Sequence, residues 1–172
     1  MKNLKKTALL GSLAAALLCG AIANASAQSI QRIYGENAAS PIAAGVSVPP
    51  GYTTFYISGA LPKPVTPAAN GQPADFGDTA TQTRSVLNGL KETMDKMGVG
   101  FGDVVAAHVF LSETADFPAM NKVWAEEFGT AAQPNKPARA AFRTYALVLP
   151  GAALEIEFIA AKKVGAAKKT KK

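Results

Sequence analysis

Two helical patterns separated by one strand pattern constrain the fold of this 172-residue chain most strongly. An amphipathic helix is predicted from Asp78 or Thr79 to Gly98, with Thr79 and Gln82 fitting a capping box at its start and Gly98 ending it. A second helix is predicted over 116–128, and an apolar strand over 104–111 lies between the two. The residues expected on the buried helix faces are Thr83, Leu87, Leu90, Met94, Met97, Phe117, Met120, Trp124 and Phe128.

Further strands are predicted at 30–34, 42–48, 52–58, 138–149 and 153–161, which gives the order β-β-β-α-β-α-β-β. The Pro- and Gly-bearing stretch 61–77 predicts a loop inside the same domain. This order predicts an α+β fold in which both helices cover one face of a mostly antiparallel sheet.

The opposite face of such a sheet has no helix to cover it. Candidate residues for this bare face are apolar: Val109, Leu147, Ile156 and Phe158. Because a large apolar surface needs cover, the pattern predicts a homo-oligomer that packs sheet faces together.

The first 27 residues read as a secretory signal peptide. Lysines precede an apolar stretch, and small residues ending at Ala27 provide a cleavage site, with Ala25 an alternative. An uncleaved anchor is the other reading of this segment. The sequence therefore predicts an exported, periplasmic protein with a single domain over 28–163. Cys19, the only cysteine, would leave with the signal; Leu18 before it is too bulky for a lipid-attachment site.

The charge of the chain is concentrated at its ends. Three of the 18 basic residues lie in the signal segment and six lie from Lys162 onward, so the remainder has fewer basic than acidic residues, of which there are 12. The segment 164–172 predicts a disordered Lys-rich tail, or one in weak contact with an anionic surface. Nucleic acid is not an expected partner, because the tail has no aromatic residue for base stacking.

Residues for metal or nucleophilic chemistry are scarce. The chain has one histidine, His108, within the predicted strand 104–111, and lacks a Gly-rich phosphate loop and a nucleophile elbow. No metal site and no cofactor are predicted. His108 itself has two readings, a structural hydrogen-bonded imidazole or a catalytic base.

Several short segments, in this order and spacing, resemble the RidA/YjgF family of reactive-intermediate deaminases over roughly residues 40–163. They are Tyr56-Ile57-Ser58-Gly59, Gln82-Thr83, Leu87-Asn88, Gly102-Asp103-Val104-Val105, Val109-Phe110-Leu111, Asp116-Phe117, Asn121, Pro137-Ala138-Arg139, Leu149-Pro150 and the run from Glu155 to Ala160. The resemblance implies a chorismate-mutase-like fold. It also implies a homotrimer with a central β-barrel and ligand clefts between subunits.

The same resemblance assigns roles to two charged residues. Arg139 is similar to the family arginine that holds a substrate carboxylate, a role that suits a guanidinium because it offers two parallel donors. An interface salt bridge is the alternative role for Arg139. Glu155 is similar to the glutamate that directs the attacking water, with a structural carboxylate as the alternative. Glu157 shares its face of the strand, so the choice of Glu155 rests on the resemblance.

Three further residues resemble family positions that line the cleft: Ser58, Gly59 and Asn121. Asn121 could instead brace the loop before Arg139. Two departures from the family pattern stand out, because Ile42 replaces a frequent tyrosine and Ala141 replaces a frequent cysteine.

The implied activity is hydrolysis of reactive 2-imino or enamine acids to 2-oxo acids and ammonia, as by a 2-iminobutanoate or 2-iminopropanoate deaminase. The small-molecule partner would be such an imino acid or its 2-oxo product. The alternatives are a non-catalytic, small-carboxylate-binding or chaperone-like trimer, and an endoribonuclease. The single histidine argues against the last, because it leaves no pair for acid-base cleavage of RNA.

Hairpin geometry predicts how the two charged residues relate. If the chain turns near 149–152, Glu155 lies opposite residue 146, roughly 23 Å from Arg139 at ~3.3 Å per residue. The two residues of one chain then cannot hold one small substrate, and a shared site must combine Arg139 of one subunit with Glu155 of its neighbour.

Overall fold

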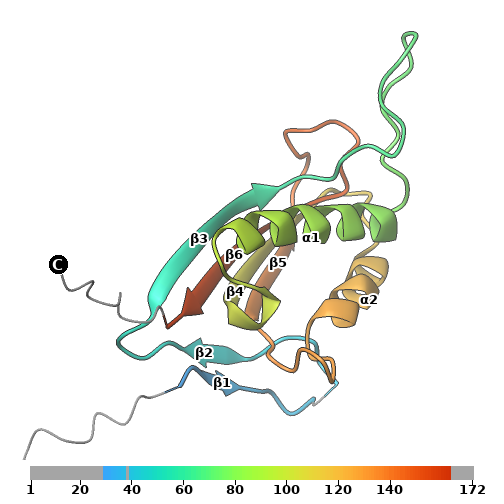
Figure 1. Cartoon of the computed structure of the whole chain (residues 1–172). Coiled ribbons are helices and arrows are strands. Elements are labelled where there is room, and N and C mark those ends of the chain that lie inside the picture. Colours follow the sequence, from blue (N-terminus) through green and yellow to red (C-terminus); the bar gives the residue numbers. More distant parts are fainter. Residues whose placement is uncertain (1–28, 38, 164–172) are drawn as a thin grey trace, which may run out of the picture.

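The computed structural model describes residues 29–37 and 39–163, so the predicted signal peptide and Lys-rich tail lie outside the described residues. The predicted order of strands and helices is confirmed (Figure 1). The elements are β1 (Gln31–Ile33), β2 (Gly45–Ser47), β3 (Thr53–Ala60), α1 (Thr79–Lys96), a short 3₁₀ turn η1 (Phe101–Asp103), β4 (Val104–Leu111), α2 (Phe117–Glu127), β5 (Ala138–Arg143) and β6 (Leu154–Lys162).

The main sheet has the strand order β3-β6-β4-β5, and β1 pairs with β2 in a separate antiparallel sheet. β6 runs antiparallel to both β3 and β4. β4 and β5 run parallel, because α2 carries the chain from the end of one strand back to the start of the other. The predicted final hairpin is therefore wrong. β5 ends at Arg143 instead of continuing to residue 149, and β6 pairs with β4 and β3 instead of β5.

Helix α1 begins at Thr79, as predicted, but its cap differs from the expected capping box. Its N-cap is Asp78, whose carboxylate accepts a hydrogen bond of 2.8 Å from the amide of Thr81. The expected capping box does not form, since Thr79 and Gln82 are buried and make tertiary contacts. Gln82 Oε1 accepts from the amide of Ala153 at 2.6 Å, and its Nε2 donates to the carbonyl of Gly77 at 3.0 Å. Gln82 thereby ties the start of α1 to the start of β6.

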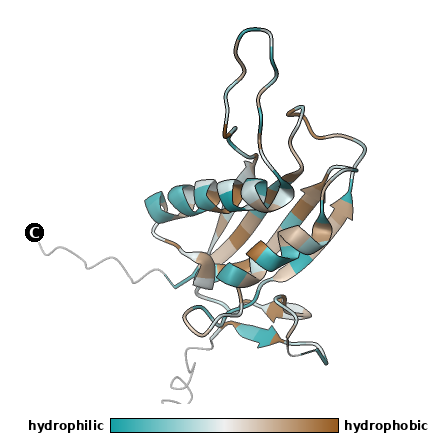
Figure 2. Ribbon diagram, turned by 90° about the vertical axis from the view of Figure 1, so that its right-hand side faces the viewer, coloured by the Kyte–Doolittle hydropathy of each residue, from teal (hydrophilic) through white to brown (hydrophobic). Residues whose placement is uncertain are grey.

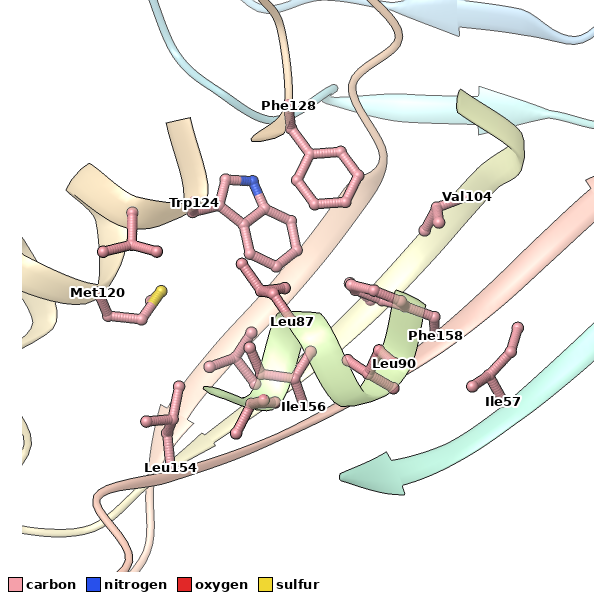
Figure 3. Packing of buried hydrophobic residues seen from close by; sticks show 14 of the residues in the cluster. Ile57, Leu87, Leu90, Val104, Met120, Trp124, Phe128, Leu154, Ile156 and Phe158 are labelled. Atoms are coloured by element: carbon pink, nitrogen blue, oxygen red, sulfur yellow. The ribbon is translucent and has the colours of Figure 1, made fainter. Parts of the chain in front are cut away.

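Both helices cover the same face of the sheet, as predicted (Figure 1). The core between them is aromatic at one end, where Trp124 stacks on Phe128 with ring centroids 4.5 Å apart. Phe158 of β6 meets both rings edge-on (Figure 3). Most of the predicted helix stripe is buried, but Met97 is 39% exposed because it is the C-cap of α1, just before the turn at Gly98.

The bare face of the sheet differs from the sequence expectation. Val109, Ile156 and Phe158 belong to the buried core under the helices, and Leu147 lies beyond the end of β5. The alternation of strand residues places their neighbours on the open face instead. This open face carries both apolar and titratable side chains: Tyr56, His108, Phe110, Phe142, Glu155, Glu157 and Ile159.

Figure 2 shows hydrophilic residues along the helices and more hydrophobic ones in the strands. The predicted loop 61–77 projects from the body as a narrow arm (Figures 1 and 2). Asn70 and Gly71 turn the arm, both with positive φ, as a two-residue turn between paired strands requires. None of the helices within the described residues is long and apolar enough to cross a membrane.

Candidate active site

Arg139 lies on β5 in register with Ala107 of β4, so its side chain projects to the face that the helices cover. Its guanidinium carbon lies 4.7 Å from the ring centroid of Trp124 and 5.8 Å from that of Phe117. Nη2 donates a hydrogen bond of 2.7 Å to Oδ1 of Asn121. Helix α2 therefore holds the guanidinium both through aromatic faces and through a directed hydrogen bond.

The charge of Arg139 is not neutralised by its surroundings. Among the described residues, no carboxylate lies within 4.0 Å of the guanidinium. Burial lowers the pKa of Arg139 from its ordinary value to about 10, so the group is still cationic at neutral pH. A largely desolvated cation with free donors and no counter-charge is a strong site for an anion, because a bound carboxylate would replace the lost hydration.

Asn121 makes a direct contact with Arg139. Asn121 lies on α2 and accepts from the guanidinium of Arg139 itself, rather than from the loop before it. Met120 adds a weaker contact, with its sulfur 3.9 Å from Nη1. One turn of α2 thus orients the cation.

Glu155 lies on β6 in register with Phe110, on the open face of the sheet. Its side chain crosses over the backbone of Gly59, where a Cβ atom would collide with Oε1 and lie 3.0 Å from Cδ. A register shift between Ile57 and Ala60 places Ser58 and Gly59 in a bulge of β3 at this point, and Ser58 is exposed. Gly59 therefore has a local role, since only a glycine leaves room for the Glu155 carboxylate in this position.

The structure places the predicted residues of one chain in two separate groups. The first half-site is defined by Arg139, Asn121 and Trp124, and the second by Glu155, Ser58 and Gly59. Arg139 and Glu155 of one chain project to opposite faces of the sheet. The hairpin arithmetic that separated them was wrong, because β4 lies between β5 and β6. The separation itself follows from the register and from the alternation of side chains.

His108 lies on the open face, where its Nδ1 is 2.7 Å from Oε1 of Glu157. This contact is the hydrogen bond that the structural reading of His108 requires. Both side chains are about 40% exposed. Within residues 29–37 and 39–163, no three side chains of the His, Cys, Asp or Glu type gather as a metal site would require.

The two departures from the family pattern lie close to the first half-site. Ala43 forms a parallel bridge with Ala138, which brings the segment of Ile42 beside the start of β5. Ile42 is partly buried against the core, and Ala141 lies two residues after Arg139 on the same face. Both side chains are aliphatic, so neither adds a polar group beside Arg139.

Trp124 and Phe117 were predicted only as core residues. The sequence does not indicate that they also flank Arg139, because the spacing of aromatic residues along a helix is the same whether they pack against leucines or against a guanidinium. One signal was present in retrospect. Asn121 precedes Trp124 by three residues, which places an amide and an aromatic on one helix face.

The comparisons decide the family. The sequence model described as Endoribonuclease L-PSP matches residues 37–162. This chain belongs to the RidA/YjgF family. Within this family it is 35% identical over 128 residues to 3-aminoacrylate deaminase RutC of Acinetobacter baylyi, covering 74% of this chain and 94% of the relative. A RutC family protein of Pyrococcus horikoshii is also 35% identical, over 130 residues that cover 76% of this chain and 96% of the relative.

Solved structures of RidA/YjgF proteins share the fold. The Rid family protein YyfB of Yersinia pestis superposes with a TM-score of 0.62 at 23% identity, covering 78% of this chain and 100% of that one. A protein of Thermotoga maritima described as a putative endoribonuclease gives a TM-score of 0.53 at 27% identity, with coverage of 78% and 99%. These structures support the predicted chorismate-mutase-like α+β fold.

Proposed function

We propose that the protein hydrolyses 2-imino acids and their enamine tautomers to 2-oxo acids and ammonia. The observation that carries this proposal is the guanidinium of Arg139, which is oriented by α2, largely desolvated and without a carboxylate partner among the described residues. A relative at 35% identity is named a 3-aminoacrylate deaminase, and its named substrate is a small enamine acid. A carboxylate and a reactive carbon–nitrogen bond are common to both substrate classes.

The proposed reaction uses two groups of the protein. Arg139 binds the substrate carboxylate and fixes the orientation of the adjacent protonated imine carbon. Glu155 accepts a proton from a water as the water oxygen bonds to that carbon. That proton then passes to the nitrogen. As the carbon–nitrogen bond breaks, the new hydroxyl group gives up its own proton through Glu155 to the departing ammonia, which leaves as ammonium and yields the 2-oxo acid. No electrons are transferred, so the reaction needs no redox cofactor.

We further propose that each site combines two copies of the chain. Arg139 and Glu155 project to opposite faces of their own sheet, so a small acid cannot touch both within one copy. The open face carries exposed aromatic side chains, with Tyr56 76% and Phe142 49% exposed, which suits packing against a second copy. A homotrimer with the ligand between subunits satisfies both requirements.

The first test measures release of the 2-oxo acid from freshly generated 2-iminopropanoate and 2-iminobutanoate, and release of ammonia from 3-aminoacrylate as a third substrate, whose product is a 3-oxo acid. The expected result is release well above the rate in buffer, lost in Arg139→Ala and in Glu155→Gln. Arg84→Ala is a matched control, because it removes an exposed arginine paired with Glu126 and should retain activity. Release no faster than in buffer for all three substrates would refute the proposed activity. If 2-oxo acids nevertheless bind through Arg139, the chain is a carboxylate-binding module.

The second test addresses the shared site. Arg139→Ala and Glu155→Gln chains, each inactive alone, are unfolded together, refolded as a mixture and assayed. If sites form between copies, random mixing restores about a quarter of the wild-type sites. Each site then has an intact Arg139 in about half of the cases and an intact Glu155 in about half, independently. A mixture as inactive as its parents would refute the shared site while leaving the reaction itself open to the first test.

A further inference from the structure

A cavity lies away from both half-sites, at the end of the sheet where β6 finishes. It has a volume of about 410 Å³, within the range of small-molecule sites. In Figure 1 the end of β6 lies beside the start of β3, near the β1–β2 pair. The residues that line it include Ser29, Arg32, Tyr52, Asp103, Lys162 and Lys163. Glu155 is seven residues from Lys162 along β6, roughly 23 Å at ~3.3 Å per residue.

The charged groups of this cavity are unbalanced. Lys162 pairs with Asp103, with Nζ 3.4 Å from Oδ2, so these two charges offset each other. Arg32 and Lys163 remain, and neither has a carboxylate within 4.0 Å among the described residues. Two cations that line one concavity without a carboxylate partner of their own favour an anion.

Arg32 is held in place by the backbone. Nη1 donates to the carbonyl of Lys136 at 2.7 Å and Nη2 to that of Gly102 at 3.2 Å, which fixes the guanidinium at the cavity wall. Burial lowers the pKa of Arg32, and the nearby charges of Tyr34 and Asp103 oppose only part of this shift. Nζ of Lys163 lies 5.3 Å from the ring centroid of Tyr52.

The two segments that flank the described residues do not supply a negative charge to this cavity. Residues 1–28 precede the cavity residue Ser29 and residues 164–172 follow Lys163, and neither segment contains an Asp or a Glu. The segment 164–172 instead adds four lysines to the same region of the sequence. Acidic side chains from these flanking segments therefore cannot neutralise Arg32 and Lys163.

We propose that this cavity, defined by Arg32, Lys162, Lys163 and Tyr52, is a binding site for a phosphate-type oxyanion. The guanidinium of Arg32 and the ammonium of Lys163 supply charge-assisted donors, and the hydroxyl of Ser29 is a further polar group of the wall. Such an oxyanion is available from free phosphate or from the headgroup of an anionic lipid. The proposal is independent of imine hydrolysis, because the cavity contains neither Arg139 nor Glu155.

The test is binding of inorganic phosphate by the full chain, measured by calorimetry against chloride at equal ionic strength. A parallel arm measures sedimentation with phosphatidylglycerol vesicles and with neutral phosphatidylcholine vesicles. Lys163→Gln is the site variant. Lys96→Gln, which removes an exposed lysine at the end of α1, is the matched control.

The expected result is saturable binding in either arm. This binding should weaken about fivefold in Lys163→Gln, because the variant loses an attraction the size of one ion pair in a high-dielectric setting, and it should be unchanged in Lys96→Gln. The arm that responds identifies the source of the oxyanion. Absence of saturable binding in both arms, or equal affinity in Lys163→Gln and the unmodified chain, would overturn the proposal. Imine hydrolysis should be the same in all of these chains.

Discussion

The contact between Gly59 and Glu155 allows a backbone-level test of the water-directing role. In Gly59→Ala the new Cβ would collide with Oε1 of Glu155 and lie 3.0 Å from Cδ and 3.2 Å from Cγ. The carboxylate must then move by about 1 Å or more to restore van der Waals contact. A misplacement of ~1 Å can cost about 100-fold in rate, which corresponds to about 2.7 kcal/mol of transition-state stabilisation.

Stability should change little in the same variant. Gly59 is exposed, does not have a positive φ, and its neighbour is the far end of a flexible side chain. Alanine lowers the conformational entropy of the unfolded chain by about 0.4–1 kcal/mol, which offsets part of the cost of moving Glu155. We therefore expect kcat/KM to fall about 100-fold while the free energy of unfolding stays within about 1 kcal/mol.

Two controls isolate the cause. Gly45→Ala makes the same substitution in β2, where an added Cβ meets nothing within 4 Å, and should leave kcat/KM unchanged. In a Glu155→Ala background the collision disappears, so Gly59→Ala should have no further effect on the residual rate. The reasoning is refuted if Gly59→Ala retains kcat/KM within about twofold, or if it loses the same factor with and without Glu155.

Four further outcomes are expected. Affinity for a 2-oxo acid should be constant between pH 7 and 9 and fall above pH about 10, where Arg139 loses its proton; a titration centred below pH 8 would implicate another group. Trp124→Leu should lower the free energy of unfolding by about 3 kcal/mol in urea titrations, since the indole is fully buried; a loss under 1 kcal/mol would contradict this. Gln82→Met should cost about 1–3 kcal/mol by leaving the amide of Ala153 unpaired, and an unchanged urea midpoint would contradict it. Protein recovered from its native cells should begin at Gln28 by N-terminal sequencing, whereas an intact Met1 would refute the signal peptide.

The local elements were predictable because their signals are local. The 3.6-residue period of α1, the Asp116 and Pro118 start of α2 and the apolar run of β4 each depend on neighbours in the chain. The capping error at α1 shows the limit of such signals. Thr79 and Gln82 have the right spacing for a capping box, but each makes a stronger contact with a residue far away in the sequence.

The pairing of strands was less predictable, because it depends on contacts between distant segments. A turn signal at Leu149-Pro150-Gly151 suggested that β5 and β6 are partners, yet β4 lies between them. The crossover through α2 requires β5 to run parallel to β4, and the last strand then fills the position between β3 and β4.

The sequence by itself determined the family, the order of elements and the two charged residues on which the proposed chemistry depends. The tertiary structure decided which face each of them occupies. Strand alternation shows that Glu155 and Glu157 share a face, but not whether a helix covers that face, because this depends on how the helices pack on the sheet. The same packing turned Trp124 from a core residue into a wall beside Arg139, and placed Arg139 and Glu155 on opposite sides of one sheet.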